Sequence, residues 1–214
     1  MTGITIEPYD LPTTVPASTA DWRAHPSRAA LLIHDMQRYF VGFYPEDGEL
    51  RRTLVRNVVQ ARETADRLGI PVFYTAQPGS MTSEDRGLLH DIWGPGMKAT
   101  PADRQVIDEL TPTPSDVVLT KWRYSAFFRT DLLDRLRAAG RDQLIVCGIY
   151  AHVGCLVTAV EAFTHDIETF FVADAVADFG PDEHRLAVGY AAANCAVATT
   201  TAALVGELEG AVVA

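Results

Sequence analysis

The feature that most constrains the fold is an alternation of short apolar runs with longer amphipathic segments. Apolar runs of strand length occupy residues 29–33, 71–75, 117–121, 144–149, 169–173 and 196–200. Between them lie segments with helical periodicity, of which residues 49–68 form the clearest. Continuous apolar strands are typical of parallel sheets covered by helices on both faces. The pattern predicts a three-layer α/β/α, Rossmann-like fold around a central, mainly parallel six-stranded sheet.

The first part of the chain departs from this pattern. Pro8, Pro12, Pro16 and Pro26 interrupt any regular element there. We therefore predict an irregular N-terminal arm over residues 1–27, followed by a single domain over residues 28–214, a size that can bury a substantial core. The N-terminus has neither a basic nor an apolar signal region, and no apolar run approaches the roughly 20 residues that span a bilayer. Both features favour a cytoplasmic protein.

Composition excludes several functions. The formal charge of −10 opposes binding to nucleic acid and to anionic membranes, and it means that a site for an anion needs its own Arg or Lys. The three cysteines form no CxxC pair, which argues against a disulfide framework and against a structural zinc site. Motifs of zinc proteases, serine hydrolases and nucleotide-binding proteins are missing from the sequence. We expect neither a metal nor a cofactor.

Two charged residues follow predicted strands, where sites of parallel sheets lie. Asp35 comes directly after the first strand. Its partial desolvation there is expected to raise its pKa and suit it to general acid catalysis, although an aspartate here could instead cap the next helix. Lys121 ends the third strand and opens an aromatic-rich run. Lys121 and Asp35 are expected to meet only if both of their strands are central in the sheet.

Polar groups follow two further strands. Gln77 and Arg86 come after the second strand, and an amide beside a guanidinium suits a ring compound that bears a carboxylate. Gly154 opens the helix after the fourth strand, where unpaired amides can bind an anion or oxyanion. Cys155 is next to it. This cysteine could be an activated thiolate or a small buried residue.

The segments that carry these residues resemble the isochorismatase family. The matching segments are LLIHDMQRYF, YTAQPGSM, WGPGMKATPADRQVIDEL, KWRYSAFF, GIYAHVGC and VADAVADF, and the resemblance spans about residues 6 to 204. In cysteine hydrolases of the same fold, such as nicotinamidases, the catalytic triad is Asp, Lys and Cys. Asp35 and Lys121 match the first two, but the cysteine position falls on Gly154. One residue is a rotation of about 100° on a helix, so Cys155 should point away from Asp35.

The resemblance implies an activity that needs no nucleophile, namely hydrolysis of the enolpyruvyl ether of isochorismate or, as we favour, of 2-amino-2-deoxyisochorismate. Protonated Asp35 would donate a proton to the terminal methylene carbon, water would add to the oxocarbenium ion, and the hemiketal would collapse to pyruvate and a ring alcohol. That alcohol is 2,3-dihydro-2,3-dihydroxybenzoate or trans-2,3-dihydro-3-hydroxyanthranilate. The resemblance also gives substrate-binding roles to a set of side chains, Gln77, Arg86, Tyr150, Phe40 and Trp93, and one to the Gly154 amide.

Three points stay open at this stage. Lys121 beside Asp35 should lower the pKa that an acid needs to have raised, so Lys121 either tunes Asp35 or orients substrate and water. A cysteine amidohydrolase that uses Cys155 is an alternative, and a non-catalytic binding module of the pathway is another. The family resemblance also implies a homodimer, for which the sequence shows no identifiable interface.

Overall fold

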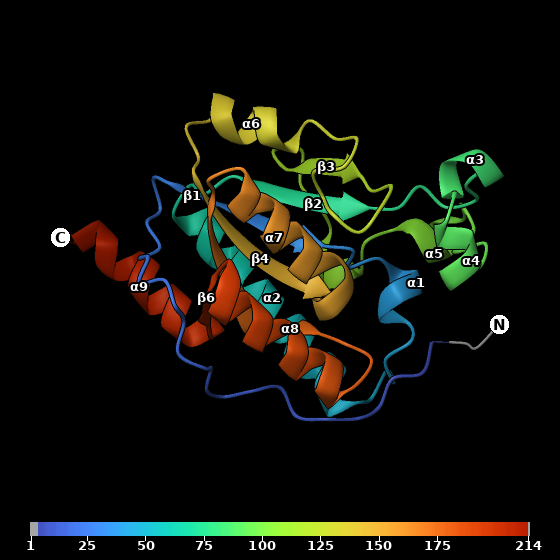
Figure 1. Ribbon diagram of the computed structural model, residues 1–214, viewed down its shortest axis with the longest axis horizontal. Coiled ribbons are helices and arrows are strands. Elements are labelled where there is room, and N and C mark those ends of the chain that lie inside the picture. The colour runs from blue at the N-terminus through green and yellow to red at the C-terminus, as the bar shows by residue number, and fades with distance from the viewer. Residues whose placement is uncertain (1–3, 214) are drawn as a thin grey trace.

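The computed structural model describes residues 4–213 and has a parallel sheet at its centre (Figure 1). The strands are β1 (Ala29–His34), β2 (Val72–Ala76), β3 (Val117–Thr120), β4 (Gln143–Ile149), β5 (Glu168–Ala177) and β6 (Val197–Thr199). Their order is β3-β2-β1-β4-β5-β6, and each pairing is parallel. The predicted fold class is therefore confirmed, with a sheet that is parallel throughout rather than mainly so.

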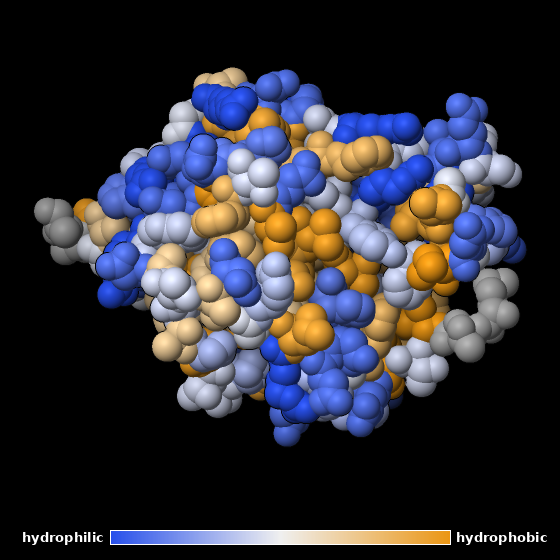
Figure 2. Space-filling model, in the orientation of Figure 1, coloured by the Kyte–Doolittle hydropathy of each residue, from blue (hydrophilic) through white to orange (hydrophobic). Residues whose placement is uncertain are grey.

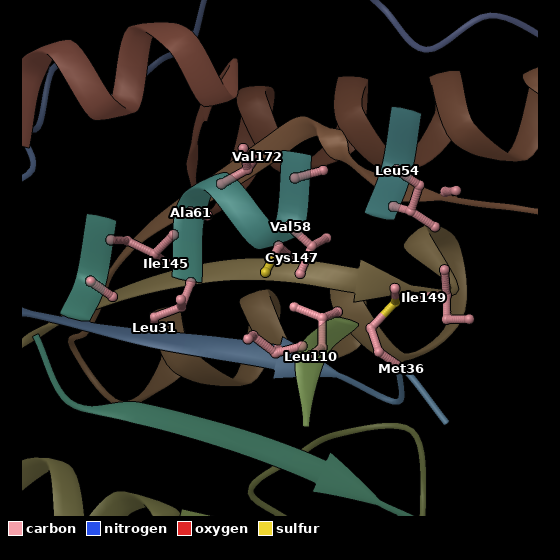
Figure 3. Close-up of a cluster of buried hydrophobic side chains, with 14 of the residues drawn as sticks. Leu31, Met36, Leu54, Val58, Ala61, Leu110, Ile145, Cys147, Ile149 and Val172 are labelled. Carbon is pink, nitrogen blue, oxygen red and sulfur yellow. The ribbon is translucent and has the colours of Figure 1, made fainter. Parts of the chain in front are cut away.

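Helices cover both faces of the sheet. One face packs against α2 (Glu49–Arg67) and α9 (Thr201–Val213), and the other against α6 (Leu132–Ala138), α7 (Leu156–Thr164) and α8 (Pro181–Asn194). Alternate residues of β1 serve the two cores, since Ile33 belongs to the first cluster and Leu32 to the second. Figure 3 shows Leu31 and Ile145 of the sheet beside Val58 and Ala61 of α2.

One strand is much longer than predicted. β5 continues to Ala177, four residues past the predicted end at Ala173. Asp174 breaks the apolar run, which is why the sequence pattern ends there. In the structure its carboxylate accepts hydrogen bonds from the backbone N–H (2.6 Å) and the hydroxyl (2.8 Å) of Thr201, at the first turn of α9. A polar side chain within the strand thus fixes the start of a helix.

Short helices, absent from the sequence prediction, gather near the carboxyl ends of the strands (Figure 1). They are α1 (Arg38–Val41), α3 (Ser83–Arg86), α4 (Leu89–Trp93), α5 (Pro101–Arg104) and the 3₁₀ helix η1 (Asp108–Leu110). A single π turn, η2 (Ala151–Cys155), joins β4 to α7. Helices this short carry too little periodicity to be recognised in a sequence. Of these, α1, α3 and α4 contribute residues to the surface at the carboxyl end of the sheet, whereas Leu110 of η1 packs into the core beside α2.

The predicted N-terminal arm contains neither helix nor strand over residues 4–28, and residues 1–3 of it lie outside the described part. It is nevertheless tied to the domain. Ile6 and Leu11 are buried in the first core, Glu7 donates a backbone hydrogen bond to Phe179, and Thr19 donates one to Ala192. Figure 1 shows the arm passing under α8 toward α9. Across the described residues, no helix combines the length and apolarity needed to cross a membrane.

One face of the molecule exposes apolar side chains. Figure 2 shows hydrophobic residues gathered over its middle, where α7 and α8 lie in Figure 1. The exposed apolar residues of these helices are Val160 and Phe163 of α7 with Leu186 and Tyr190 of α8. Such an apolar grouping is more typical of an association surface than of an isolated monomer.

Candidate active site

The strand order reverses between β1 and β4, and the carboxyl ends of these strands open into a cavity. Ligands of open α/β sheets bind at this position. The cavity has about 630 Å³ of space free of atoms, including its open mouth. All eight residues singled out in the sequence line it, namely Asp35, Phe40, Gln77, Arg86, Trp93, Lys121, Tyr150 and Gly154. The structure thus brings these residues together at one cavity, while their roles stay predictions.

Asp35 is held rigidly at the cavity floor. Its φ of 49° lies in the left-handed region, which few non-glycine residues adopt although Asp and Asn are enriched there. The Thr75 hydroxyl donates to its Oδ1 at 2.5 Å, and the Lys121 Nζ donates to its Oδ2 at 2.8 Å. Thr75 in turn accepts the backbone N–H of Asp35 at 3.0 Å. Both carboxylate oxygens therefore have a fixed donor, and the helix-cap alternative is wrong for this residue.

Desolvation was expected to raise the pKa of Asp35 and Lys121 to lower it, and the contacts of the carboxyl decide between the two effects. Burial does raise the pKa of this carboxyl, but the nearby Lys121 ammonium and the hydrogen bonds from Lys121 and Thr75 lower it by more. The net shift is downward. Asp35 is consequently ionised at neutral pH, and it must take up a proton before it can act as an acid.

Lys121 reaches Asp35 from a strand that is not central, so the condition stated for their meeting is wrong. β3 is an edge strand, and β2 lies between it and β1. The backbone N–H of Lys121 donates to Ala76 at 2.9 Å, which continues the β2–β3 ladder just past the end of β3. The side chain spans the end of β2 because the lysine chain is long and β2 stops at this level. The ammonium is almost completely buried, with an exposed fraction of 2% for the residue.

His34, the last residue of β1, is completely buried beside this pair. Its Nδ1 lies 3.1 Å from the carbonyl of Ile149 and 3.6 Å from Oδ2 of Asp35, and its Nε2 lies 3.2 Å from the Thr158 hydroxyl. Burial, aided by repulsion from Lys121, lowers the pKa of His34 from 6.5 to about 4. The imidazole is therefore neutral at neutral pH.

This shift gives a testable stability effect. A histidine that stays neutral in the fold contributes its full stability above pH 6.5 and loses it as the pH falls toward 4, since only the unfolded chain takes up the proton. Below pH 6.5, wild type is expected to lose about 1.4 kcal/mol of unfolding free energy per pH unit relative to His34→Leu. Urea unfolding of both proteins from about pH 7.5 to about pH 5 measures the difference. A difference that does not change with pH would contradict the assignment.

Besides Lys121, the cavity contains the guanidinium of Arg86. Arg86 is buried, and its guanidinium donates to the carbonyl of Gly94 at 2.9 Å and to Oε1 of Gln77 at 3.2 Å. Among the described residues, no carboxylate lies within 4 Å of it, and burial lowers its pKa. Gly96 leaves room for it, because a Cβ there would come within 2.9–3.1 Å of the guanidinium. A buried guanidinium without an acidic partner is suited to bind an anionic ligand.

Aromatic rings form the remaining wall. Phe179 lies 4.5 Å from Tyr150 and 5.8 Å from Trp93 between ring centroids, and Phe40 meets Tyr150 edge-on at 6.2 Å. The Trp93 Nε1 donates to the hydroxyl of Tyr124 at 2.9 Å. This wall offers ring faces and apolar edges to a flat ligand.

The Gly154 amide is not unpaired, so the prediction of a free anion-binding amide here is wrong. The backbone N–H groups of Val153, Gly154 and Cys155 all donate to the single carbonyl of Tyr150, at 3.1–3.3 Å. The turn is a π turn rather than the first turn of an α-helix, and its geometry aims these amides at one acceptor. Gly154 still lines the cavity, where it contributes space rather than a donor.

Cys155 is a fully buried core residue that does not line the cavity. Burial raises its pKa well above the usual value, so it is not an activated thiolate. This supports its interpretation as a small buried residue. Among residues 4–213, no three His, Cys, Asp or Glu side chains stand close enough to hold a metal ion.

The sequence prediction missed several residues of the site. Thr75 is at the predicted end of the second strand and could have been found by the strand-end rule, but Phe179 could not, because the fifth strand was predicted to end at Ala173. Arg123 was noted only as part of its run, yet it lines the cavity and donates to two backbone carbonyls at 2.7 Å. Ile4 also lines the cavity, although no local sequence signal brings the arm there.

Comparisons with known proteins bear on this site. The model of the isochorismatase domain matches residues 29–203. The chain is 57% identical over 204 residues to the phenazine biosynthesis protein PhzD of Pseudomonas fluorescens, covering 94% of this chain and 98% of that one. It is 51% identical to the isochorismatase of Bacillus subtilis, covering 96% of this chain and 67% of that one. A cysteine hydrolase of Pseudomonas syringae shares the fold, with a TM-score of 0.81, 24% identity, and coverage of 93% and 100%.

The fold and cavity define a doubly wound α/β protein with a buried carboxylate–ammonium pair at its topological switch point. Within that class, the domain match and the identity to curated relatives are decisive. The chain belongs to the isochorismatase family.

Proposed function

We propose that this protein is a vinyl ether hydrolase that cleaves the enolpyruvyl ether of 2-amino-2-deoxyisochorismate, and of isochorismate, to pyruvate and a ring alcohol. The observation that carries the proposal is the pairing of a buried carboxylic acid with a glycine where related hydrolases have their cysteine. Asp35 faces the cavity, and Gly154 offers no side chain to attack a substrate. Such a site can donate a proton and admit water, but it cannot form a covalent intermediate through position 154.

The charges of the cavity suit a ring compound with more than one carboxylate. Arg86 has no acidic partner among the described residues, and Gln77 and Arg123 lie on the same cavity surface. The chain carries a net charge of −10, so this local positive charge is needed for an anion to bind. The aromatic wall of Tyr150 and Phe179 accommodates the ring.

Substrate binding makes Asp35 take up the proton that it needs from solvent. Carboxylates of the ligand bring negative charge next to Asp35 and compete for Lys121, and both effects raise the pKa of Asp35 toward that of a useful acid. Asp35 then protonates the terminal methylene carbon. As a carboxylate it stabilises the oxocarbenium ion until water adds, and Lys121 orients the water and the substrate's carboxylate. Since the acid form is required, kcat is expected to fall as the pH rises.

Pyruvate release tests the proposal. The purified protein is mixed with each ether in turn, and pyruvate is followed through lactate dehydrogenase. The expected result is release from both, faster with the amino compound, which is the substrate favoured by the phenazine-pathway resemblance. Release from neither ether would contradict the proposal. A faster rate with isochorismate would overturn the choice of preferred substrate and leave the reaction type intact.

The cysteine amidohydrolase alternative makes a separate prediction. Cys155 is fully buried and does not line the cavity, so Cys155→Ala is expected to leave pyruvate release essentially unchanged. Treatment of native protein with a thiol-alkylating reagent is expected to have no effect either, because all three cysteines are buried. Loss of activity in a folded Cys155→Ala protein would revive a nucleophilic role for this thiol.

Two further parts of the proposal concern the protein's setting. We place it in the cytoplasm, supported by three cysteines that are all free and buried, as expected in a reducing compartment.

We also propose a homodimer through the exposed apolar residues of α7 and α8. Sedimentation of wild type against a Leu186→Glu variant tests that assembly, since a buried charge would dissociate it. An unchanged molecular mass would rule out this surface.

A further inference from the structure

The proposed chemistry leaves unexplained why a fully buried histidine lies directly behind Asp35. The ring of His34 occupies the space that a side chain at position 154 would need. A Cβ at that position would lie 2.8 Å from Nδ1 and 3.0 Å from Nε2 of His34, and it would overlap Cε1. The backbone of Gly154 is not in the left-handed region, and the three atoms nearest to such a Cβ all belong to the His34 ring. The two residues are therefore coupled by packing.

The polar neighbours of His34 bear on its tautomer. A carbonyl can only accept, so the Ile149 oxygen, 3.1 Å from Nδ1, favours a proton on that nitrogen. The Thr158 hydroxyl accepts the backbone N–H of Ala126 at 3.0 Å, which leaves its own proton free to be donated to Nε2 at 3.2 Å. The Ile149 carbonyl and the nearby Asp35 carboxylate both favour a proton on Nδ1, whereas the Tyr124 carbonyl is a competing acceptor for the ring.

The Nδ1–H also faces the acid. It lies 3.6 Å from Oδ2 of Asp35, the oxygen that accepts from Lys121 at 2.8 Å. The positive end of the imidazole dipole therefore favours this orientation of the carboxylate. Ala126 belongs to the segment that begins at Lys121, so Thr158 connects that segment to His34 as well. The histidine links the three parts of the chain that must stay aligned, which are the end of β1, the end of β4 and the segment after β3.

We propose that His34, as its Nδ1–H tautomer, is a positioning residue for Asp35 and that it occupies the place of a nucleophile's side chain, so that His34 and Gly154 act as one specificity-determining pair. With this pair in place, the site can donate a proton but has no nucleophile at position 154. A side chain at position 154 would displace the His34 ring, which positions Asp35. The inference rests on the proposed function for its effect on rate. Its packing and its tautomer are independent of that function.

A double-mutant cycle tests the coupling. Gly154→Ala alone is expected to displace the ring and lower Tm by about 5 °C, whereas the same change in a His34→Ala background is expected to have almost no effect, because the space is then free. The cycle can be read from Tm without any substrate. Equal Tm changes in the two backgrounds would overturn the pairing.

Two substitutions of His34 distinguish its positioning of Asp35 from its packing against Gly154. His34→Leu keeps similar bulk but has no N–H, and it is expected to lower kcat about tenfold with little change in KM. His34→Asn can place an amide N–H near the position of Nδ1 and is expected to recover most of that loss. Equal kcat in both variants and wild type would overturn the positioning role.

The tautomer is checked on wild type at neutral pH by long-range ¹H–¹⁵N correlation, with His34→Leu identifying the signal. A protonated Nδ1 and an unprotonated Nε2 are expected, and the reverse pattern would overturn the proposal. Failure of the proposed function is distinguishable from failure of this inference. A wild-type protein that cleaves neither ether contradicts the function, while the Tm cycle and the tautomer still decide the His34–Gly154 pair.

Discussion

Asp35→Asn is expected to reduce pyruvate release by about 10²–10⁴-fold, the usual contribution of a general acid. The amide has nearly the shape of the carboxyl group, and its single oxygen can still accept from Lys121 while its NH2 faces the Thr75 hydroxyl, which can accept. It cannot donate a proton at a useful rate to a carbon atom. The loss should therefore appear in kcat, with KM changed much less, because the missing interaction belongs to the transition state. Coupled assay of purified variant and wild type gives both constants.

The matched control is Asp134→Asn, which removes the same charge from the exposed surface of α6. It is expected to behave as wild type. Circular dichroism and Tm verify that Asp35→Asn is folded, which is necessary because the variant leaves Lys121 buried without a counter-charge. A folded Asp35→Asn protein with wild-type kcat would refute the role of Asp35 as the acid.

Arg86→Gln is expected to lower kcat/KM by about 10²-fold, mostly through a higher KM. Loss of one partner of a buried charge pair commonly costs 2–5 kcal/mol, and each 1.36 kcal/mol is a factor of ten. The effect falls on KM because Arg86 would bind the substrate carboxylate in ground state and transition state alike. The effect of Arg86→Gln on Tm should differ from its effect on kcat/KM. The guanidinium is buried without an acidic partner among the described residues, so its removal is expected to leave Tm equal or higher.

Arg86→Lys and Arg137→Gln complete this experiment. Arg86→Lys keeps the positive charge but loses the planar guanidinium that can form two parallel hydrogen bonds. Its kcat/KM is expected to lie between those of wild type and Arg86→Gln. Arg137 is exposed on α6 and serves as the control for loss of a surface arginine. An Arg86→Gln protein with unchanged KM for both ethers would show that substrate carboxylates bind elsewhere in the cavity.

The sequence located the strands and the site because both depend on local pattern. Buried parallel strands are continuous apolar runs, so β1, β2 and β4 were predicted to within one residue at each end. Asp35, Lys121 and Gln77 were found because they follow those runs, and a parallel sheet brings such positions to one edge. The resemblance then added Tyr150, Phe40 and Trp93, which periodicity alone does not distinguish from ordinary core residues.

What the sequence missed depends on contacts between distant segments. The order of the strands is not encoded locally, so the edge position of β3 and the long reach of Lys121 were not foreseen. The net direction of the Asp35 pKa shift depends on that same contact. The π turn after β4 is tied to Asp178, whose carboxylate accepts the N–H of His152 at 2.6 Å. No residue close in sequence predicts such a turn. Because the turn was not predicted, the hydrogen bond from the Gly154 amide to Tyr150 was not predicted either.

The position of the cleaved bond tests the central claim most directly. Cleavage is carried out in water enriched in oxygen-18, and the ring alcohol is analysed by mass spectrometry, since its hydroxyl does not exchange with solvent. If Asp35 protonates the vinyl ether and water adds to the enolpyruvyl carbon, the ring oxygen is retained and the ring product carries no label. Label in the ring hydroxyl would mean that water attacks the ring carbon instead, and it would contradict protonation of the vinyl ether as the catalytic step.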